Sequence, residues 1–234
     1  MNHTKDTYKL NLRKNTQKFT IYYTVSDETC INEIAEILEN NYSILTKRLN
    51  QELEDKINIE IHYEHCQLLK ALGFPNAPKW VRGGINSNKI LIASPLNPPY
   101  GSDSNNVVKT AVHELIHIIL RHINDDLPRW LDEGIASFEA KDNNADRIRR
   151  TVSSGVQTNS IPTFDDLDTG KDFELFFNRD GYQYSYSIVE SIVHNYGYEK
   201  LNEFVRMPDH SHEILGVTLM ELQNQWINYI KEHY

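Results

Sequence analysis

Apolar and polar residues alternate in two short stretches of the first hundred residues, a period typical of half-buried strands, and a third short stretch is mostly apolar. We expect strands over 19–25, 57–63 and 89–94, the last of them at the edge of a sheet. Between the first two, apolar residues recur every three or four positions over 31–49, which predicts one long amphipathic helix. The first part of the chain therefore predicts a mixed sheet together with a long helix.

From residue 106 onward the hydrophobic pattern is helical. A buried helix is expected over 106–122, a second begins near Trp130, and a third covers 182–196 and ends at Gly197. A last helix begins at Thr218, whose hydroxyl can form a capping box with the glutamate three residues later. The predicted buried face of this last helix consists of Leu219, Leu222, Trp226 and Ile230.

Strands in the first part and helices in the second predict an α+β domain with a helical C-terminal lobe. The most plausible boundary is the polar segment 142–162, which is rich in Asn, Asp, Ser and Gly. We therefore expect an N-terminal α+β lobe over 1–142 and a helical C-terminal lobe over 143–234, which together form one functional unit.

Charge and composition exclude several classes of protein. The chain has 24 Lys and Arg against 33 Asp and Glu, and its net charge of −9 argues against nucleic acid or an anionic membrane as a partner. No apolar run approaches the roughly 20 residues that cross a bilayer. The polar start 1–6 predicts no secretory signal, and Cys30 and Cys66 are expected to be reduced, buried thiols. A cytoplasmic protein is the expectation.

The pentapeptide His113-Glu-Leu-Ile-His117 carries the clearest chemical signal. Two imidazoles four residues apart on a helix lie one above the other and can bind one metal ion. Glu114 lies beside them and can accept a proton from metal-bound water. The alternative is a pair of ordinary helix histidines. However, the rest of this helix is strongly apolar, and polar side chains there are costly unless a metal or hydrogen bonds satisfy them.

A catalytic zinc needs a third protein ligand and one open position. After fifteen intervening residues comes Glu133, within the segment Trp-Leu-Asp-Glu-Gly-Ile-Ala-Ser-Phe over 130–138. A carboxylate on this next helix can complete the site from the opposite side. Its neighbour Asp132 is the competing candidate, although it would point to a different face of the helix.

The two segments together resemble the gluzincins, the thermolysin-like clan of zinc peptidases. The second segment is especially similar to the W-L-x-E-G-x-A-S-F segment of alanyl-aminopeptidase-type enzymes and of small bacterial peptidase-MA-like domains. By position, the resemblance implies that His113, His117 and Glu133 are zinc ligands and that Glu114 is the general base. It also implies a zincin-like fold with a central motif helix, and one Zn²⁺ per chain in a cleft between the lobes.

The same resemblance suggests further site residues. Tyr182 occupies the place of the family's tyrosine that stabilises the transition state, and Tyr186, one turn further along, is a weaker candidate. With 13 tyrosines in the chain, packing in the core is an equally plausible role for Tyr182. Ser137, one turn after Glu133, either helps to orient a ligand histidine or only packs between helices.

One departure from the family pattern bears on the substrate. Aminopeptidase-type enzymes have a G-x-M-E-N segment whose glutamate binds the free amine of the substrate, whereas the comparable segment 83–88 contains no acid. The expected function is therefore a zinc-dependent endopeptidase acting on a peptide or protein. The alternatives are an aminopeptidase of the same clan, an enzyme of the clan with a non-peptide substrate, and a zincin-fold binding or scaffold protein that has lost catalysis.

Overall fold

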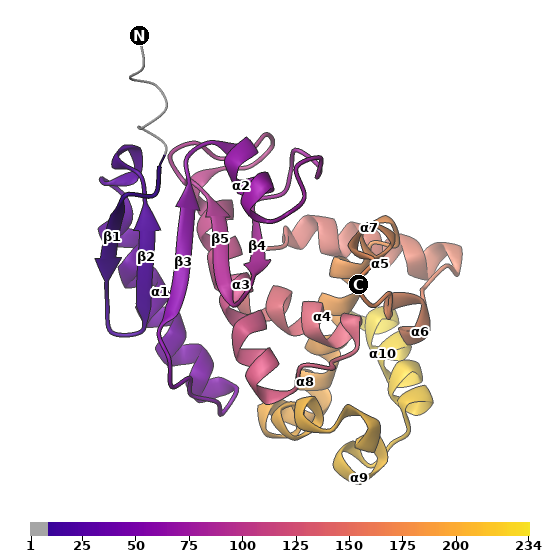
Figure 1. Cartoon of the computed structure of the whole chain (residues 1–234). Helices are drawn as coiled ribbons and strands as arrows, with labels where there is room; N and C mark the ends of the chain where they lie inside the picture. Colours follow the sequence, from indigo (N-terminus) through magenta and orange to yellow (C-terminus); the bar gives the residue numbers. More distant parts are fainter. Residues whose placement is uncertain (1–8) are drawn as a thin grey trace. The chain divides into compact units, whose positions relative to one another are not determined.

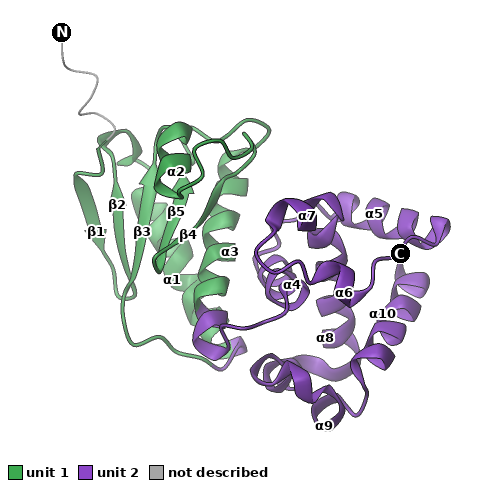
Figure 2. Cartoon of the chain, turned by 45° about the vertical axis from the view of Figure 1, so that its right-hand side comes forward, with its two compact units in different colours: residues 1–47, 51–118 green, residues 48–50, 119–234 purple. Residues whose placement is uncertain are grey.

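The computed structural model describes residues 9–234 and consists of two compact units. Unit 1 comprises residues 1–47 and 51–118, and unit 2 comprises residues 48–50 and 119–234 (Figure 2). The start of the chain, in which we expect no secretory signal, lies outside the described residues.

Unit 1 is built on a mixed five-stranded sheet in the order β1-β2-β3-β5-β4 (Figure 1). The three inner strands are parallel to one another, while β1 and β4 pair antiparallel at the two edges. The strands are β1 (Leu12–Asn15), β2 (Phe19–Tyr23), β3 (Ile57–His62), β4 (Gly83–Asn86) and β5 (Lys89–Ala93).

The three predicted strands are confirmed as β2, β3 and β5, but the prediction that 89–94 forms the sheet edge is wrong. The short strand β4 pairs outside β5 and occupies that edge. A Cβ atom on Gly83 would lie 2.7 Å from the carbonyl oxygen of Leu91 and 3.0 Å from Cγ2 of Thr110. Glycine therefore lets β4 approach both its partner strand and the helix that carries Thr110.

The helices of unit 1 follow the apolar stripes of the sequence. Phe19 of β2 meets Tyr42 of α1 edge-on with ring centroids 6.0 Å apart, so the buried stripe of α1 covers the sheet. Cys30 is half-buried and Cys66 is exposed, so the prediction of two buried thiols is wrong for Cys66, which lies in the first turn of a short helix. The helical segments that begin in this unit are η1 (Val25–Asp27), α1 (Ile31–Arg48), α2 (His65–Ala71) and α3 (Ser104–Ile123).

Unit 2 is helical, and α8 is its central element because α4, α5, α7, α9 and α10 all pack against it. Its core contains stacked aromatic rings: Trp130 and Phe164 have centroids 4.4 Å apart, and the indole N–H of Trp226 donates to Oγ of Ser187 at 3.0 Å. The segments are α4 (Arg129–Ala140), α5 (Ala145–Thr158), α6 (Phe164–Leu167), α7 (Phe173–Asn178), α8 (Gly181–Arg206), η2 (Pro208–His210), α9 (Ser211–Leu215) and α10 (Leu219–His233).

The helix boundaries predicted for this unit are largely confirmed. Gly197 interrupts α8 with φ 77° and ψ 172°, and a second helical stretch continues to Arg206. Thr218 caps α10, and its hydroxyl accepts from the backbone N–H of Glu221. Leu222, Trp226 and Ile230 are buried as expected, but Leu219 is 40% exposed, since the first turn of α10 is only partly covered. The α+β class predicted from the sequence is confirmed.

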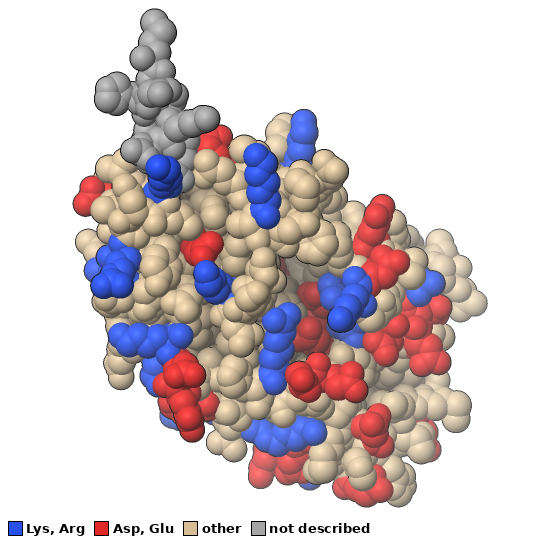
Figure 3. Space-filling view, viewed as in Figure 1, with Lys and Arg blue, Asp and Glu red and all other residues tan. Residues whose placement is uncertain are grey.

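The surface reflects the acidic composition of the chain. Acidic side chains gather over the helices of unit 2 on the face drawn in Figure 3, whereas Lys and Arg are spread over both units. Within residues 9–234, no helix combines the length and the apolar character that crossing a membrane requires.

Candidate metal centre

The two histidines of the motif lie one turn apart on α3. Their Nε2 atoms are 3.0 Å apart and their ring centroids 4.7 Å apart, so both imidazoles present a nitrogen to the same point. Two nitrogen ligands of one tetrahedral zinc ion would be separated by about 3.3 Å. Both side chains belong to residues that are nearly inaccessible to solvent, His113 at 6% and His117 at 8%.

Glu133 completes a group that fits a metal ion. His113, His117 and Glu133 are all buried, and their ligand atoms lie within 4.8 Å of one another. Two imidazole nitrogens and one carboxylate oxygen are the donor set of a catalytic zinc site with an open fourth position. The structure thus brings together the three residues that the sequence nominated, while the competing Asp132 does not belong to the group.

Glu114 and Ser137 flank these ligands in sequence but differ in environment. Glu114 follows His113 directly on α3 and is partly accessible, as a residue that exchanges protons with water needs to be. Ser137 lies one turn after Glu133 on α4 and is fully buried. Its hydroxyl has no hydrogen-bond partner in the part of the chain that the structure describes.

A close contact between α4 and α8 positions the tyrosine candidates. A Cβ atom on Gly134 would lie 2.6 Å from the carbonyl oxygen of Ser185, so only glycine lets α8 pass so near the residue after Glu133. Tyr182 precedes Ser185 by one turn, at the start of α8. The ring of Tyr182 packs edge-on against Phe176 with centroids 5.0 Å apart.

Tyr186 has different neighbours. Its ring packs against Phe138 of α4 with centroids 5.4 Å apart. It also lines a surface hollow of about 330 Å³ together with Glu190, Tyr229 and Tyr234. Burial and the charge of Glu190 raise the pKa of Tyr186, so its phenol stays protonated at neutral pH.

Sequence reasoning missed Arg129, the first residue of α4. Its Nη2 atom lies 2.7 Å from Oε1 of Glu133, in an ion pair with four-residue spacing. Burial lowers the pKa of Arg129, but the neighbouring Glu133 carboxylate, Tyr182 and the Asp132 carboxylate together raise it above its usual value. The sequence signal for this ion pair is the four-residue spacing of Arg129 and Glu133, because residues four apart on a helix are neighbours.

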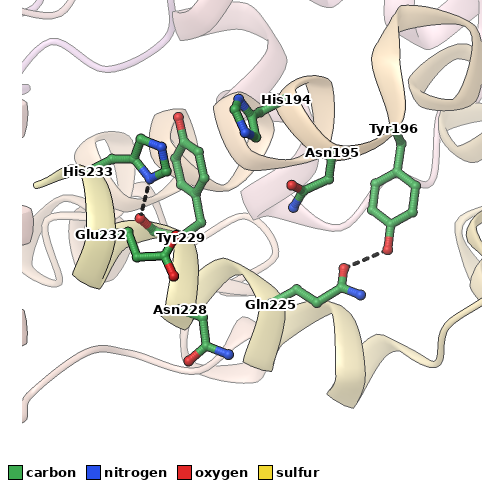
Figure 4. A pocket seen from close by; sticks show the side chains of 8 residues that line it. All are labelled: His194, Asn195, Tyr196, Gln225, Asn228, Tyr229, Glu232 and His233. Carbon is green, nitrogen blue, oxygen red and sulfur yellow. Dashed lines mark hydrogen bonds between the residues drawn. The ribbon is translucent and has the colours of Figure 1, made fainter.

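A polar hollow of about 450 Å³ lies where α8 faces α10 (Figure 4). His194, Tyr229 and His233 lie close together in it, with the His194 ring 5.2 Å from Tyr229 and 5.4 Å from His233. Two pairs of its lining residues bond to each other: Tyr196 donates to Gln225 at 2.5 Å, and a ring nitrogen of His233 contacts the Tyr229 carbonyl at 2.8 Å. This hollow contains none of the predicted metal ligands.

An α+β fold with a mixed sheet, a motif helix and a buried group of two histidines and one glutamate is typical of zincin-like metal-dependent peptidases. Residues 40–232 match the family model of the peptidase MA superfamily, and the chain belongs to that superfamily. Its members are peptidases, so the substrate class is peptide or protein. Among curated proteins, none matches this chain.

Proposed function

We propose that this protein is a zinc-dependent endopeptidase. The observation that carries the proposal is the buried group of His113, His117 and Glu133, whose donor set suits zinc better than a hard cation such as magnesium. Bound at these three residues, zinc would lower the pKa of a water molecule towards about 7 and polarise the scissile carbonyl.

Two residues of the chain carry out proton transfer and stabilisation of the transition state. Glu114 accepts the proton of the attacking water and delivers it to the leaving amine nitrogen as the C–N bond breaks. Tyr182 donates its phenolic hydrogen to the oxygen that gains negative charge in the transition state. Tyr182 packs on Phe176, over which Arg129 also lies, and Arg129 pairs with Glu133; this arrangement supports the role of Tyr182.

Two features of unit 1 support cleavage inside a peptide chain. Strand β4 is a sheet edge, to which an extended substrate can add as a further strand. Gly83 of β4 lies against Thr110, one turn before His113 on α3, so a substrate on this edge would run close to the first histidine. The segment 83–88 also offers no carboxylate to bind a free N-terminal amine.

The test is a cleavage profile of the zinc-loaded protein on a proteome-derived peptide mixture, with Glu114→Gln as the control. We expect about one zinc per chain and internal cleavages that are absent in the control. Release of single N-terminal residues would instead indicate an aminopeptidase. Bound zinc without cleavage of any peptide would contradict the peptidase proposal and favour a binding protein.

A further inference from the structure

The hollow that Tyr186 lines in unit 2 has aromatic rings around one carboxylate. Its volume of about 330 Å³ lies at the small end of the roughly 300–1,000 Å³ typical of ligand pockets, so it suits a small molecule or a single side chain. Three helices contribute its polar and aromatic lining: Arg149 comes from α5, Tyr186 and Glu190 from α8, and Tyr229, His233 and Tyr234 from the end of α10.

The aromatic surface of this hollow is held in place by contacts within unit 2. Tyr229 and His233 lie one turn apart on α10, and their rings stack with centroids 4.1 Å apart, side by side in Figure 4. The hydroxyl of Tyr234 donates to Oε2 of Glu190 at 2.7 Å, which keeps the Tyr234 ring next to the carboxylate. The hollow therefore presents several ring surfaces close to one acidic group.

The phenols of the hollow carry no charge at neutral pH. Burial and the charge of Glu190 raise the pKa of Tyr229 to about 12. Burial and the hydrogen bond to Glu190 likewise raise the pKa of Tyr234, and Tyr186 is also shifted upward. The three tyrosines thus offer neutral rings, whose faces attract cations.

The carboxylate of Glu190 has no cationic partner. It is half-buried and forms no ion pair with a Lys, Arg or His side chain among residues 9–234. Arg149 lines the same hollow, but it is exposed and pairs with no carboxylate in the part of the chain that the structure describes. A shielded carboxylate beside aromatic faces is a favourable environment for an organic cation, which both kinds of group attract.

We propose that this hollow is a binding site for an organic ammonium group, carried either by a small quaternary ammonium compound or by a lysine side chain of another protein. The ammonium lies against the aromatic rings, within reach of the Glu190 carboxylate. The inference does not depend on the proposed zinc peptidase function, because neither the predicted metal ligands nor Glu114 line the hollow.

The first test compares choline with 3,3-dimethylbutan-1-ol, a neutral molecule of the same shape in which carbon replaces the ammonium nitrogen. Each is titrated into the full chain and its binding is followed by NMR. We expect saturable binding of choline and about fivefold or weaker binding of the alcohol, because only choline gains the cation–π and carboxylate attraction. Equal binding of the two would overturn the proposal, since the charge would then contribute nothing.

The source of the ammonium group is tested with a peptide that contains a single lysine and with the same peptide carrying norleucine instead. Both are titrated in the presence of a chelator, so that cleavage at the proposed metal centre does not interfere. Tighter binding of the lysine peptide than of choline assigns the site to a protein side chain, and the reverse order assigns it to a small molecule. Failure of both choline and the lysine peptide to bind would overturn the proposal.

Two substitutions test whether the ligand occupies this hollow. Tyr229→Leu removes one ring and keeps an apolar side chain, so it should weaken choline binding by about two- to fivefold. Glu190→Gln keeps an acceptor for the Tyr234 hydroxyl but loses the charge, and it should weaken binding by about fivefold or more. Glu190→Gln decides the test if Tyr229→Leu does not fold, and unchanged affinity in a folded Glu190→Gln protein would overturn the proposal.

Two further variants serve as controls of sign and place. Glu232→Gln removes an exposed charge from the same helix, on the side of the other hollow, and should leave the affinity within about twofold. Arg149→Gln removes a positive charge from the lining and should strengthen choline binding. If Arg149→Gln weakened binding instead, the hollow would be a site for an anion and the proposal would be wrong.

Discussion

At the scale of single residues, the two glutamates proposed for the metal centre have different surroundings. Glu133 is buried, belongs to the group with the two histidines and is paired with Arg129. Glu114 is partly accessible and lies outside that group. The same substitution at the two positions should therefore have different effects.

Replacing Glu114 by Gln should leave zinc binding intact and abolish nearly all hydrolysis, because the amide cannot accept a proton. Replacing Glu133 by Gln should lower zinc affinity at least tenfold, because a neutral amide is a poor ligand and leaves Arg129 unpaired. Elemental analysis and a peptide-cleavage assay measure the two effects. Loss of zinc from Glu114→Gln but not from Glu133→Gln would show that the two roles are reversed.

Tyr182→Phe removes one hydroxyl and keeps the ring that packs on Phe176. A donor to the transition state should affect kcat and not KM, and removing one such donor typically costs about 2.7–4 kcal/mol, or roughly 100- to 1,000-fold in kcat. Tyr186→Phe is the matched control, since Tyr186 lies against Phe138 instead. If Tyr186→Phe were the slower variant, the role would belong to Tyr186.

The two cysteines should differ in reactivity. Burial and the nearby Asp27 carboxylate raise the pKa of Cys30 to about 11, so at pH 8 this group is almost entirely the unreactive thiol. Cys66 is exposed. Mass spectrometry after brief iodoacetamide treatment at pH 8 should find Cys66 labelled first, with labelling of Cys30 increasing as the pH rises towards 11. Equal labelling at pH 8 would contradict the burial of Cys30.

At the scale of elements, the packing of α4 on α8 depends on Gly134. A methyl group there would meet the backbone oxygen of Ser185 at 2.6 Å, and backbone cannot move aside as a side chain can. Gly134→Ala should therefore destabilise the protein by about 1–3 kcal/mol, measured by urea unfolding. Ser154→Ala on the exposed face of α5 is the control and should stay within about 0.5 kcal/mol.

Elements with a clear period were predictable from the sequence, while those held by tertiary contacts were not. The strands β2 and β3 show alternation, β5 is a short apolar run, and α1 and α10 show apolar stripes. Strand β4 begins with two glycines and has no alternating pattern of its own. It forms because it pairs with β5 and packs closely against α3, and these tertiary contacts are not visible in the local sequence.

The metal-site candidates followed from short motifs whose spacing is local, and the structure brings three of them together. Arg129 escaped notice because an arginine four residues before a glutamate is usually a surface pair. Its importance appears only when Glu133, with which it pairs, is seen to be buried. Contacts between segments that are far apart in the sequence cannot be predicted from the local pattern of either segment.

At the scale of the whole molecule, metal binding should stabilise the fold, because three ligands from two helices exist only in the folded state. With free zinc at 100 times its Kd, the gain should be about 2.7 kcal/mol. Thermal unfolding with zinc and with a chelator measures it. Glu114→Gln should keep the full shift and His113→Ala/His117→Ala should lose it, whereas a shift retained by the double variant would place the zinc elsewhere.

The contact between Gly134 and Ser185 also has an evolutionary consequence. It brings α4 into direct contact with α8. The segment 141–180, which connects the two helices in sequence, therefore begins and ends close to this contact. Insertions and deletions are tolerated where they do not disturb such a contact. Because α5, α6 and α7 within this segment pack in the core of unit 2, relatives should vary in length most freely in the loop that joins α5 to α6, where a substrate-selecting loop could be grafted without displacing the glutamate on one side or the tyrosine on the other.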